Sequence, residues 1–496
     1  MILTLLLVAL PLAGCLAVFA LPEHEAVRFS VLVTALTLLD AAVLAASFDY
    51  DRTAEIQKAV DWSWVSAIGL RFHLGVDGIS LPLVVLTALL TMLCSIYLLR
   101  PTSRPSRPRF LTSLLMLLEV AMIGTFLALD LLLFFVFFEL VLLPMYAVIA
   151  GWGGPGRTAA ARQFIVYTLL GSGFLLVGLF LIYAHTGTLD MVVLAHRHGE
   201  GLSRTVQVVA FLFVAGGLAV KVPMWPLHTW LPDAHTEAPT VGSVLLAGVL
   251  LKMGTYGLVR IAVPILPEGA AVIAPYLGAL GVIGIIYAAL ACLAQRNLKR
   301  LIAFSSVGHM GLVLLGIASL TPVGINAAIY ASVAHGLITG LLFFLVGGVA
   351  ERYGTTDIAK LGGGLLASAP RLGSLLVFAS VASIGVPGLA GFWGEMLAMF
   401  SAYKPNPSLD RGVYLTFLAV AGLGSVLTAT YFLVMLRRVA YGVVRARWRD
   451  VSIRDVTSVE WASWVPLVVI VVGFGLWPAF LLGVTNEAVR LLLGGG

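Results

Sequence analysis

Apolar windows, each long enough to cross a lipid bilayer as a helix, recur along the whole of this 496-residue sequence. A membrane-spanning helix needs ~20 predominantly apolar residues, because each residue adds only ~1.5 Å along the axis. Such windows fall near residues 2–20, 28–47, 80–99, 110–129, 131–150, 164–184, 206–225, 240–262, 271–293, 299–319, 323–349, 372–401, 411–436 and 460–483. The composition, 60% hydrophobic and 11% charged, excludes an ordinary soluble domain. We therefore predict an all-α polytopic membrane protein with about 14 transmembrane helices.

Lysine and arginine gather in the loops that follow odd-numbered windows, most densely at residues 100–109 and 437–454. Positively charged loops stay in the cytoplasm, so we expect both termini outside, in a bacterial cytoplasmic (inner) membrane. The same rule accounts for the net charge of +6, and the sequence therefore gives no reason to expect nucleic-acid binding. The alternating stretch 71–80 (RFHLGVDGIS) contains turn-forming residues and predicts a small hairpin on the outer surface.

Two lysines, Lys221 and Lys252, lie inside apolar windows and are flanked by valine, leucine, alanine and glycine. An ionisable group at membrane depth is costly, and it usually marks a site of function. Burial disfavours the charged form of a lysine, whereas a nearby carboxylate restores it. Lys252 has no acidic residue within two turns on its own helix, which favours a site that alternates between neutral and charged forms. The two lysines therefore suggest a proton path.

Two predicted helices are interrupted beside ionisable residues. Pro223 follows Lys221, and Pro387 precedes Glu395 among several glycines. A proline removes a backbone donor and clashes with the preceding turn, so we predict a broken helix at each place. Broken helices in corresponding places of two halves are typical of transporters built from inverted repeats. We expect N-terminal helices 1–3 (residues 1–109), a first five-helix repeat of spans 4–8 (110–262), an inverted second repeat of spans 9–13 (263–440) and a C-terminal helix (441–496).

Several motifs resemble the antiporter-like membrane subunits of proton-translocating NADH:quinone oxidoreductase, respiratory complex I. The motifs are FFVFFELVLLPMYAVIAGWG, KVPMWPLHTWLPDAHTEAPTVGSVLLAGVLLKMGTYGLVR, QRNLKRLIAFSSVGHMG, SVAHGLITGLLFFLVGG and PGLAGFWGE. The resemblance runs from about residue 73 to 440. The most similar type is chain M, equivalent to mitochondrial NADH dehydrogenase subunit 4, because Glu395 stands where related subunits usually carry lysine. A subunit of a multisubunit cation/proton antiporter is the alternative, since such subunits share the two lysines.

The resemblance implies a proton-translocating role for six residues: Glu139, Lys221, Lys252, His309, His335 and Glu395. It pairs Glu139 with Lys221 as an electrostatic switch and makes Lys252 the central relay. His309 and His335 would bridge Lys252 to Glu395, the outward terminal. A static ion pair, or histidines that are merely hydrogen-bonded core residues, are the structural alternatives. Secondary candidates are Glu119, His228 and His235, the two histidines belonging to a proline-rich segment that we interpret as cytoplasmic turn and capping chemistry.

The chain lacks sequence signatures for handling electrons. Cys15, Cys94 and Cys292 are isolated in apolar segments, and His309 and His335 have no ligand companions, so no disulfide framework, iron-sulfur cluster or metal site is expected. The resemblance places flavin, iron-sulfur clusters and quinone in partner subunits, so the chain is expected to act as part of an enzyme without a cofactor or redox centre of its own. Its expected partners are other complex I membrane subunits, including antiporter-like chains of the L and N types, and membrane lipid.

Overall fold

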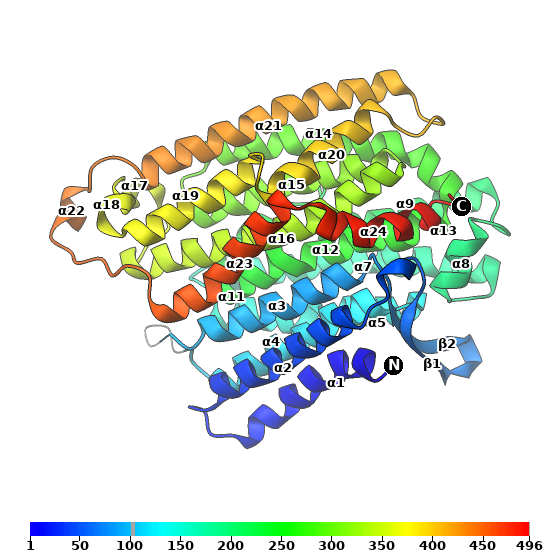
Figure 1. Cartoon of the computed structure of the whole chain (residues 1–496), viewed down its shortest axis with the longest axis horizontal. Helices are drawn as coiled ribbons and strands as arrows, with labels where there is room; N and C mark the ends of the chain where they lie inside the picture. The colour runs from blue at the N-terminus through cyan, green and yellow to red at the C-terminus, as the bar shows by residue number, and fades with distance from the viewer. Residues whose placement is uncertain (101–104, 496) are drawn as a thin grey trace.

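Long apolar helices packed side by side make up most of the protein, as the computed structural model, which describes residues 1–100 and 105–495, shows in Figure 1. Among those residues, twelve helices are long and apolar enough to cross a membrane, and each coincides with a predicted window. The other two windows, near residues 80–99 and 372–401, contain the shorter apolar helices α3 (Leu81–Tyr97) and α19 (Pro370–Ile384). The predicted all-α membrane class is confirmed.

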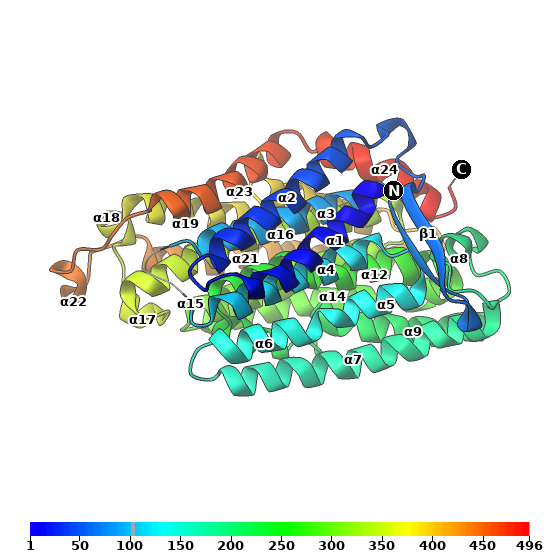
Figure 2. The same ribbon diagram turned by 90° about the horizontal axis from the view of Figure 1, so that it is seen from below.

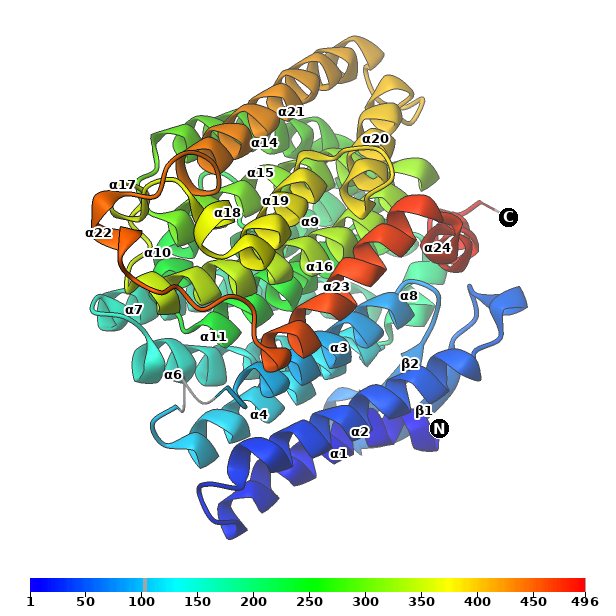
Figure 3. The same cartoon turned by 60° about the vertical axis from the view of Figure 1, so that its left-hand side comes forward.

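The N-terminal region lies along one edge of the bundle, where α1 and α2 run side by side (Figures 1 and 3). Its elements are α1 (Ile2–Ala17), η1 (Val18–Ala20), α2 (Ala26–Ala46), η2 (Tyr50–Arg52), β1 (Gln57–Val65), η3 (Ser66–Ile68), β2 (Leu70–Val76) and α3. The hairpin β1–β2 is antiparallel and lies near the N-terminus.

The hairpin differs from its prediction in extent. Residues 71–76 form only its second strand, and the partner strand Gln57–Val65 precedes the predicted stretch. The turn formers at 77–80 instead start α3, because the Asp77 carboxylate accepts the backbone N–H groups of Ile79 and Ser80. The Asp77 carboxylate and the Ser80 hydroxyl thus accept backbone N–H groups of the turn that leads into α3, and no hairpin turn forms here.

The middle of the chain forms two successive groups of helices. The first group contains α4 (Pro108–Leu127), α5 (Leu131–Leu140), α6 (Leu142–Trp152), α7 (Arg157–Thr186), α8 (Met191–Arg197), α9 (Arg204–Lys221), α10 (Trp230–Glu237), α11 (Thr240–Leu245), η5 (Leu246–Leu250), α12 (Leu251–Gly257), η6 (Leu258–Ala262) and α13 (Val263–Ile265). The second contains α14 (Pro267–Ala294), α15 (Leu298–Ala318), α16 (Pro322–Tyr353), α17 (Ile358–Leu361), α18 (Leu365–Ser368), α19, α20 (Ala390–Tyr403) and α21 (Arg411–Val439). The C-terminal region contains α22 (Ala446–Arg449), α23 (Ser458–Leu476) and α24 (Ala479–Leu492).

Two spans form the centre of the bundle. The most apolar stretch of Thr240–Ile265 is entirely buried and that of α16 is 94% buried, whereas those of α1 and α21 are 33% and 28% buried. These central spans carry Lys252 and His335. Their ionisable side chains are therefore surrounded by protein rather than by lipid, which is the condition for tolerating them at membrane depth.

One local arrangement occurs twice in the chain. An isolated antiparallel bridge joins Asp130 to Asp190, and a second joins Asn297 to Asp357, 167 residues further along at both positions. In each pair the first residue caps the helix that begins a membrane-spanning segment, α5 or α15, and the second caps a short helix, α8 or α17. The helices α7 and α16 that lead into these turns both end on a left-handed glycine, with φ of 68° and 62°. This recurrence supports the prediction that spans 4–8 and 9–13 are related.

Both termini lie at the same end of the bundle, together with the hairpin and α24 (Figures 1 and 2). The segments α17, α18 and α22 lie at the opposite end. This arrangement agrees with the sequence prediction that loops after odd- and even-numbered spans lie on opposite sides.

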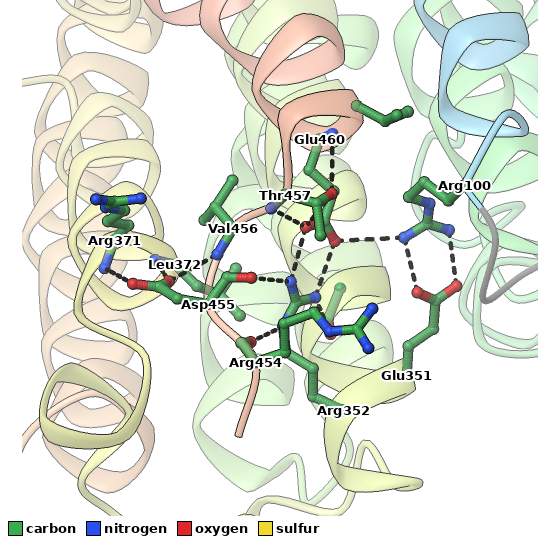
Figure 4. Close-up of polar contacts among 12 residues, drawn as sticks. Arg100, Glu351, Arg352, Arg371, Leu372, Arg454, Asp455, Val456, Thr457 and Glu460 are labelled. Atoms are coloured by element: carbon green, nitrogen blue, oxygen red, sulfur yellow. Dashed lines mark hydrogen bonds and ion pairs between the residues drawn. The ribbon is translucent and has the colours of Figure 1, made fainter. Parts of the chain in front are cut away.

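Ion pairs fasten together the helix ends opposite the termini (Figure 4). Arg352 Nη2 lies 2.7 Å from Glu460 Oε2, and Arg100 Nη2 lies 2.7 Å from Glu351 Oε1. The Asp455 carboxylate accepts the first backbone N–H groups of α19. This cluster fixes α3, α16 and α23 relative to one another and to the start of α19. Removing one partner of a buried pair leaves an unpaired charge and costs about 3–5 kcal/mol.

Helices end near both predicted breaks. The helix α9 ends at Lys221 and α10 begins at Trp230, with Pro223 between them. The Trp230 indole donates to the Val220 carbonyl at 3.0 Å and so satisfies an acceptor at the end of α9. The helix α19 ends at a left-handed glycine, and α20 begins at residue 390, with Pro387 between them.

Candidate functional site

The carboxylate of Glu139 lies in the last turn of α5, where the span is interrupted before α6 begins. It accepts a hydrogen bond from the hydroxyl of Ser172, a buried residue of α7. The contact fixes the carboxylate between two helices of the first half and gives its charge a donor within the protein.

The amine of Lys221 lies beside Glu139 without forming an ion pair with it. Its Nζ donates to the Phe138 carbonyl at 2.6 Å and lies 3.3 Å from the centre of the Phe138 ring. That carbonyl belongs to the last turn of α5, where acceptors lack a partner further along the helix. The expected pair is thus a neighbouring acid and amine, each held by its own partner, rather than the direct ion pair that the structural alternative proposed.

Lys252 is fully buried in α12, between the π-helical segments η5 and η6. Its Nζ donates to the Ala247 carbonyl in η5 and lies 2.6 Å from His335 Nδ1. The wide turns of a π-helix disturb the regular backbone pairing and are frequent at functional sites. Within residues 1–100 and 105–495, no carboxylate forms an ion pair with Lys252.

Two histidines continue from Lys252 toward Glu395. The rings of His335 in α16 and His309 in α15 have their centres 5.5 Å apart. His309 Nε2 lies 3.7 Å from the carboxylate of Glu395 in α20. These groups share a small cavity of about 20 Å³, which has room for about one water molecule. The helices α12, α15, α16 and α20 thus bring together four residues that lie far apart in the sequence.

The hydrogen bonds around the histidines constrain where their protons lie. His309 Nδ1 contacts the Ser305 carbonyl at 2.8 Å, and Nε2 contacts the Ser383 carbonyl at 2.9 Å. A carbonyl only accepts, so both contacts are satisfied together when the His309 ring carries both protons. The Nδ1 of His335 faces the Lys252 amine, and its Nε2 is buried without a protein partner in the described residues. A charged Lys252 therefore requires the lone pair of His335 at Nδ1 and a proton at Nε2.

The side chains of the secondary candidates form no hydrogen bond with these four residues in the described part of the chain. Glu119 is fully buried in α4, and neither of its oxygens has a hydrogen-bond partner among the described residues. His228 and His235 pack against aromatic rings, with ring centres 4.9 Å from Tyr287 and 4.4 Å from Phe343 respectively. His228 lies in the turn before α10 and His235 lies within α10, and both side chains are buried, which the prolines and polar neighbours of this segment did not indicate.

A family described as "NADH:quinone oxidoreductase/Mrp antiporter, TM" matches residues 128–428. This chain belongs to that family. Subunit M of the NADH-quinone oxidoreductase of Rickettsia conorii is 39% identical over 464 residues, which cover 94% of this chain and 91% of the relative. Chain 4 of the NAD(P)H-quinone oxidoreductase of Synechococcus sp. (strain JA-3-3Ab) is 41% identical over 481 residues, covering 95% and 89%. A chain of respiratory complex I from Thermus thermophilus superposes with a TM-score of 0.87 at 30% identity, covering 99% and 100%.

Membership of this family confirms the resemblance inferred from the motifs. Ser172 was not predicted as a partner of the family's glutamate in span five. It is one hydroxyl in an apolar helix, and the sequence marks it only by the glycines on either side. No group of three or more histidine, cysteine, aspartate or glutamate side chains is placed to hold a metal ion in the described part of the chain.

Proposed function

We propose that this chain is a proton-translocating membrane-arm subunit of NADH:quinone oxidoreductase. The observation that carries the proposal is the series of contacts from Lys252 through His335 and His309 to Glu395. Similarity over nearly the whole length to subunit M of Rickettsia conorii and to a chain of Thermus thermophilus complex I supports assembly in that enzyme.

Each step moves one proton between neighbouring groups. Lys252 donates its proton to His335 Nδ1, which lies 2.6 Å away, and becomes a neutral amine. His309, which carries both ring protons in the arrangement described above, gives one of them to the carboxylate of Glu395. His335 then replaces that proton by releasing its own from Nε2 through a water molecule in the shared cavity. Histidine suits this position because it gains and loses a proton near neutrality.

Release requires that Glu395 reach water outside the bundle. Its helix α20 follows the interruption at Pro387, where the backbone is irregular and can line a wet cavity. With both termini outside, in a bacterial inner membrane, the second half delivers protons outward. Charge in the loops after odd-numbered spans supports this orientation.

In this proposal Glu139 and Lys221, in the first half, control when Lys252 loses its proton. A carboxylate close to a buried amine stabilises the charged form of the amine. When the carboxylate moves away, the amine loses its proton more easily. Glu139 and Lys221 are near each other but bonded to Ser172 and to the Phe138 carbonyl. A small movement of α5 relative to α9 therefore changes the charge of Lys221, which in turn shifts the proton affinity of Lys252.

The energy comes from elsewhere in the complex. Flavin, iron-sulfur clusters and quinone belong in this proposal to partner subunits, and antiporter-like chains of the L and N types are the expected neighbours within the lipid. The chain itself is a driven translocase component of the respiratory chain.

The proposal is tested by Lys252→Ala in the assembled complex, with Lys404→Ala as the matched control because Lys404 is exposed. We expect NADH-driven proton pumping in membrane vesicles to fall at least about tenfold in Lys252→Ala, as on removal of an acid–base group, and to stay normal in the control. Normal pumping by an assembled Lys252→Ala complex would refute the relay.

A further inference from the structure

The last turn of α19 lies between His309 and Glu395, the two residues of the final proposed transfer. The Ser383 carbonyl, in that turn, accepts from His309 Nε2 at 2.9 Å. The helix then ends at Gly385, which has a left-handed backbone with φ of 82°. A Cβ atom on Gly385 would lie 2.9 Å from Glu395 Oε2. One turn of backbone therefore lies against both the donor and the acceptor of that transfer.

The proton on His309 Nε2 is directed to the carbonyl rather than to the carboxylate. Nε2 lies 3.7 Å from Glu395 Oε1, which is beyond hydrogen-bond distance. It carries a single proton, and the Ser383 carbonyl is its closer acceptor. A backbone carbonyl accepts a hydrogen bond but does not take up the proton, so this contact keeps the proton on His309. Transfer to Glu395 then requires Nε2 and the carboxylate to approach each other.

Gly385 leaves the space that the Glu395 carboxylate occupies. A Cβ atom at this position would be closer to Glu395 Oε2 than the 3.4 Å at which ordinary van der Waals contact begins. The carboxylate would have to move by about half an ångström to restore that distance. The end of a glutamate side chain rotates easily, so it moves more readily than the backbone of α19. A side chain at position 385 therefore displaces the acceptor without unfolding the turn.

A second glycine brings α20 against the same turn. A Cβ atom on Gly391 would clash with the carbonyl oxygen of Ala382, so the backbones of α20 and α19 are in close contact there. Gly391 and Glu395 are four residues apart and share one face of α20. The close approach at Gly391 thus holds the Glu395 side chain next to the end of α19.

We propose that the last turn of α19 positions the final proton transfer, with the Ser383 carbonyl holding the proton on His309 and Gly385 seating the Glu395 carboxylate. The inference rests on the proposed function, because it takes Glu395 as the acceptor of that proton. The donor and the acceptor are held just out of contact, so the turn delays the transfer until the two side chains approach each other. Gly385 is a positioning residue, since it acts through Glu395 and exchanges no proton itself.

Gly388 provides a matched control for Gly385. Both glycines have left-handed backbones, with φ of 91° and 82° respectively, so alanine strains the backbone similarly at either position. A Cβ atom on Gly388 would meet the Leu476 side chain at an ordinary contact distance of 4.0 Å. A purely conformational requirement for glycine predicts the same loss at both positions. A seat for the carboxylate predicts a loss that is specific to Gly385→Ala.

The measurement is NADH-driven proton pumping by the whole complex in vesicles, divided by the amount of assembled complex. A misplacement of reacting groups by about 1 Å costs on the order of 100-fold in rate, so a shift of about half that size should lower pumping by Gly385→Ala at least about fivefold. Gly388→Ala should keep most of its pumping. Glu395→Asp shortens the acceptor by one methylene and makes room for the new methyl group, so adding Gly385→Ala to Glu395→Asp should cause no further loss.

Equal losses in Gly385→Ala and Gly388→Ala, or normal pumping by an assembled Gly385→Ala complex, overturn the positioning role. A further loss when Gly385→Ala is added to Glu395→Asp also overturns it, because the two changes would then act independently. Glu395→Ala in the same assay separates this inference from the proposed function. Normal pumping by Glu395→Ala refutes the relay itself, whereas loss in Glu395→Ala with normal pumping by Gly385→Ala refutes only the positioning by α19.

Discussion

The two halves of the bundle hold their ionisable residues in opposite ways. In the first half, Glu139 and Lys221 are neighbours, but each is bonded to another group. In the second half, His309 lies within 3.7 Å of Glu395 and next to the ring of His335, which touches Lys252. A gap between an acid and an amine responds to small movements of helices, whereas a series of ionisable groups around a cavity with room for one water molecule is able to pass protons on. The first half is therefore suited to control and the second to conduction.

The distinction between the two halves would be contradicted most strongly if one residue of the series in the second half could be removed without loss of proton pumping. We expect His335→Leu to lower NADH-driven pumping at least about tenfold, because no other described side chain joins the Lys252 amine to His309. Proton pumping by the assembled complex in vesicles measures this. His185→Leu, which removes an exposed imidazole, should pump normally, and a similar loss in both would mean that the effect is not specific to the series.

A smaller, graded effect is expected in the first half. Glu139→Asp keeps the charge and moves it by one methylene, so it should retain more pumping than Glu139→Ala. The same vesicle assay, normalised to assembled complex, compares the two variants. Equal loss in both would show that the carboxylate acts through its contact with Ser172 rather than through its charge.

The smallest effect concerns the two matched bridges. Asp190→Ala and Asp357→Ala each remove a helix cap worth about 1 kcal/mol, which should speed amide hydrogen exchange at the starts of α8 and α17 about fivefold. Mass spectrometry of exchange in the complex measures both sites. Unchanged exchange in either variant would mean that its bridge, rather than the side chain, holds the turn.

Acid should affect the Asp190 cap in a defined direction. Burial raises the pKa of Asp190, but the His73 imidazole nearby and the capped backbone N–H groups lower it, and the net pKa lies below its ordinary value. Its contribution to stability is therefore complete above the ordinary carboxyl pKa and is lost as pH falls through the lowered value. Exchange at α8 should accelerate over that acidic range in the wild-type protein and show no such step in Asp190→Ala.

The sequence predicted the spans well because crossing a bilayer needs a long apolar run, and such a run is visible without any partner. It also identified Lys252, His309 and Glu395 as ionisable groups in apolar surroundings, although their contacts could not be read. Side-chain partners depend on how helices pack, so the apolar pattern of the sequence does not indicate the bond from Ser172 to Glu139. The burial of His235 was missed for the same reason, since its stacking ring comes from α16, more than a hundred residues away.

The paired bridges indicate the order in which parts of the protein are able to fold during synthesis. Each joins residues only 60 positions apart, so each loop closes with partners from its own half. The Asp130–Asp190 closure can form while the ribosome is still translating the second half, since domains generally fold as units from the N-terminus during synthesis. The contact between Lys252 and His335 joins the two halves, so it can be completed only after the second half has been translated.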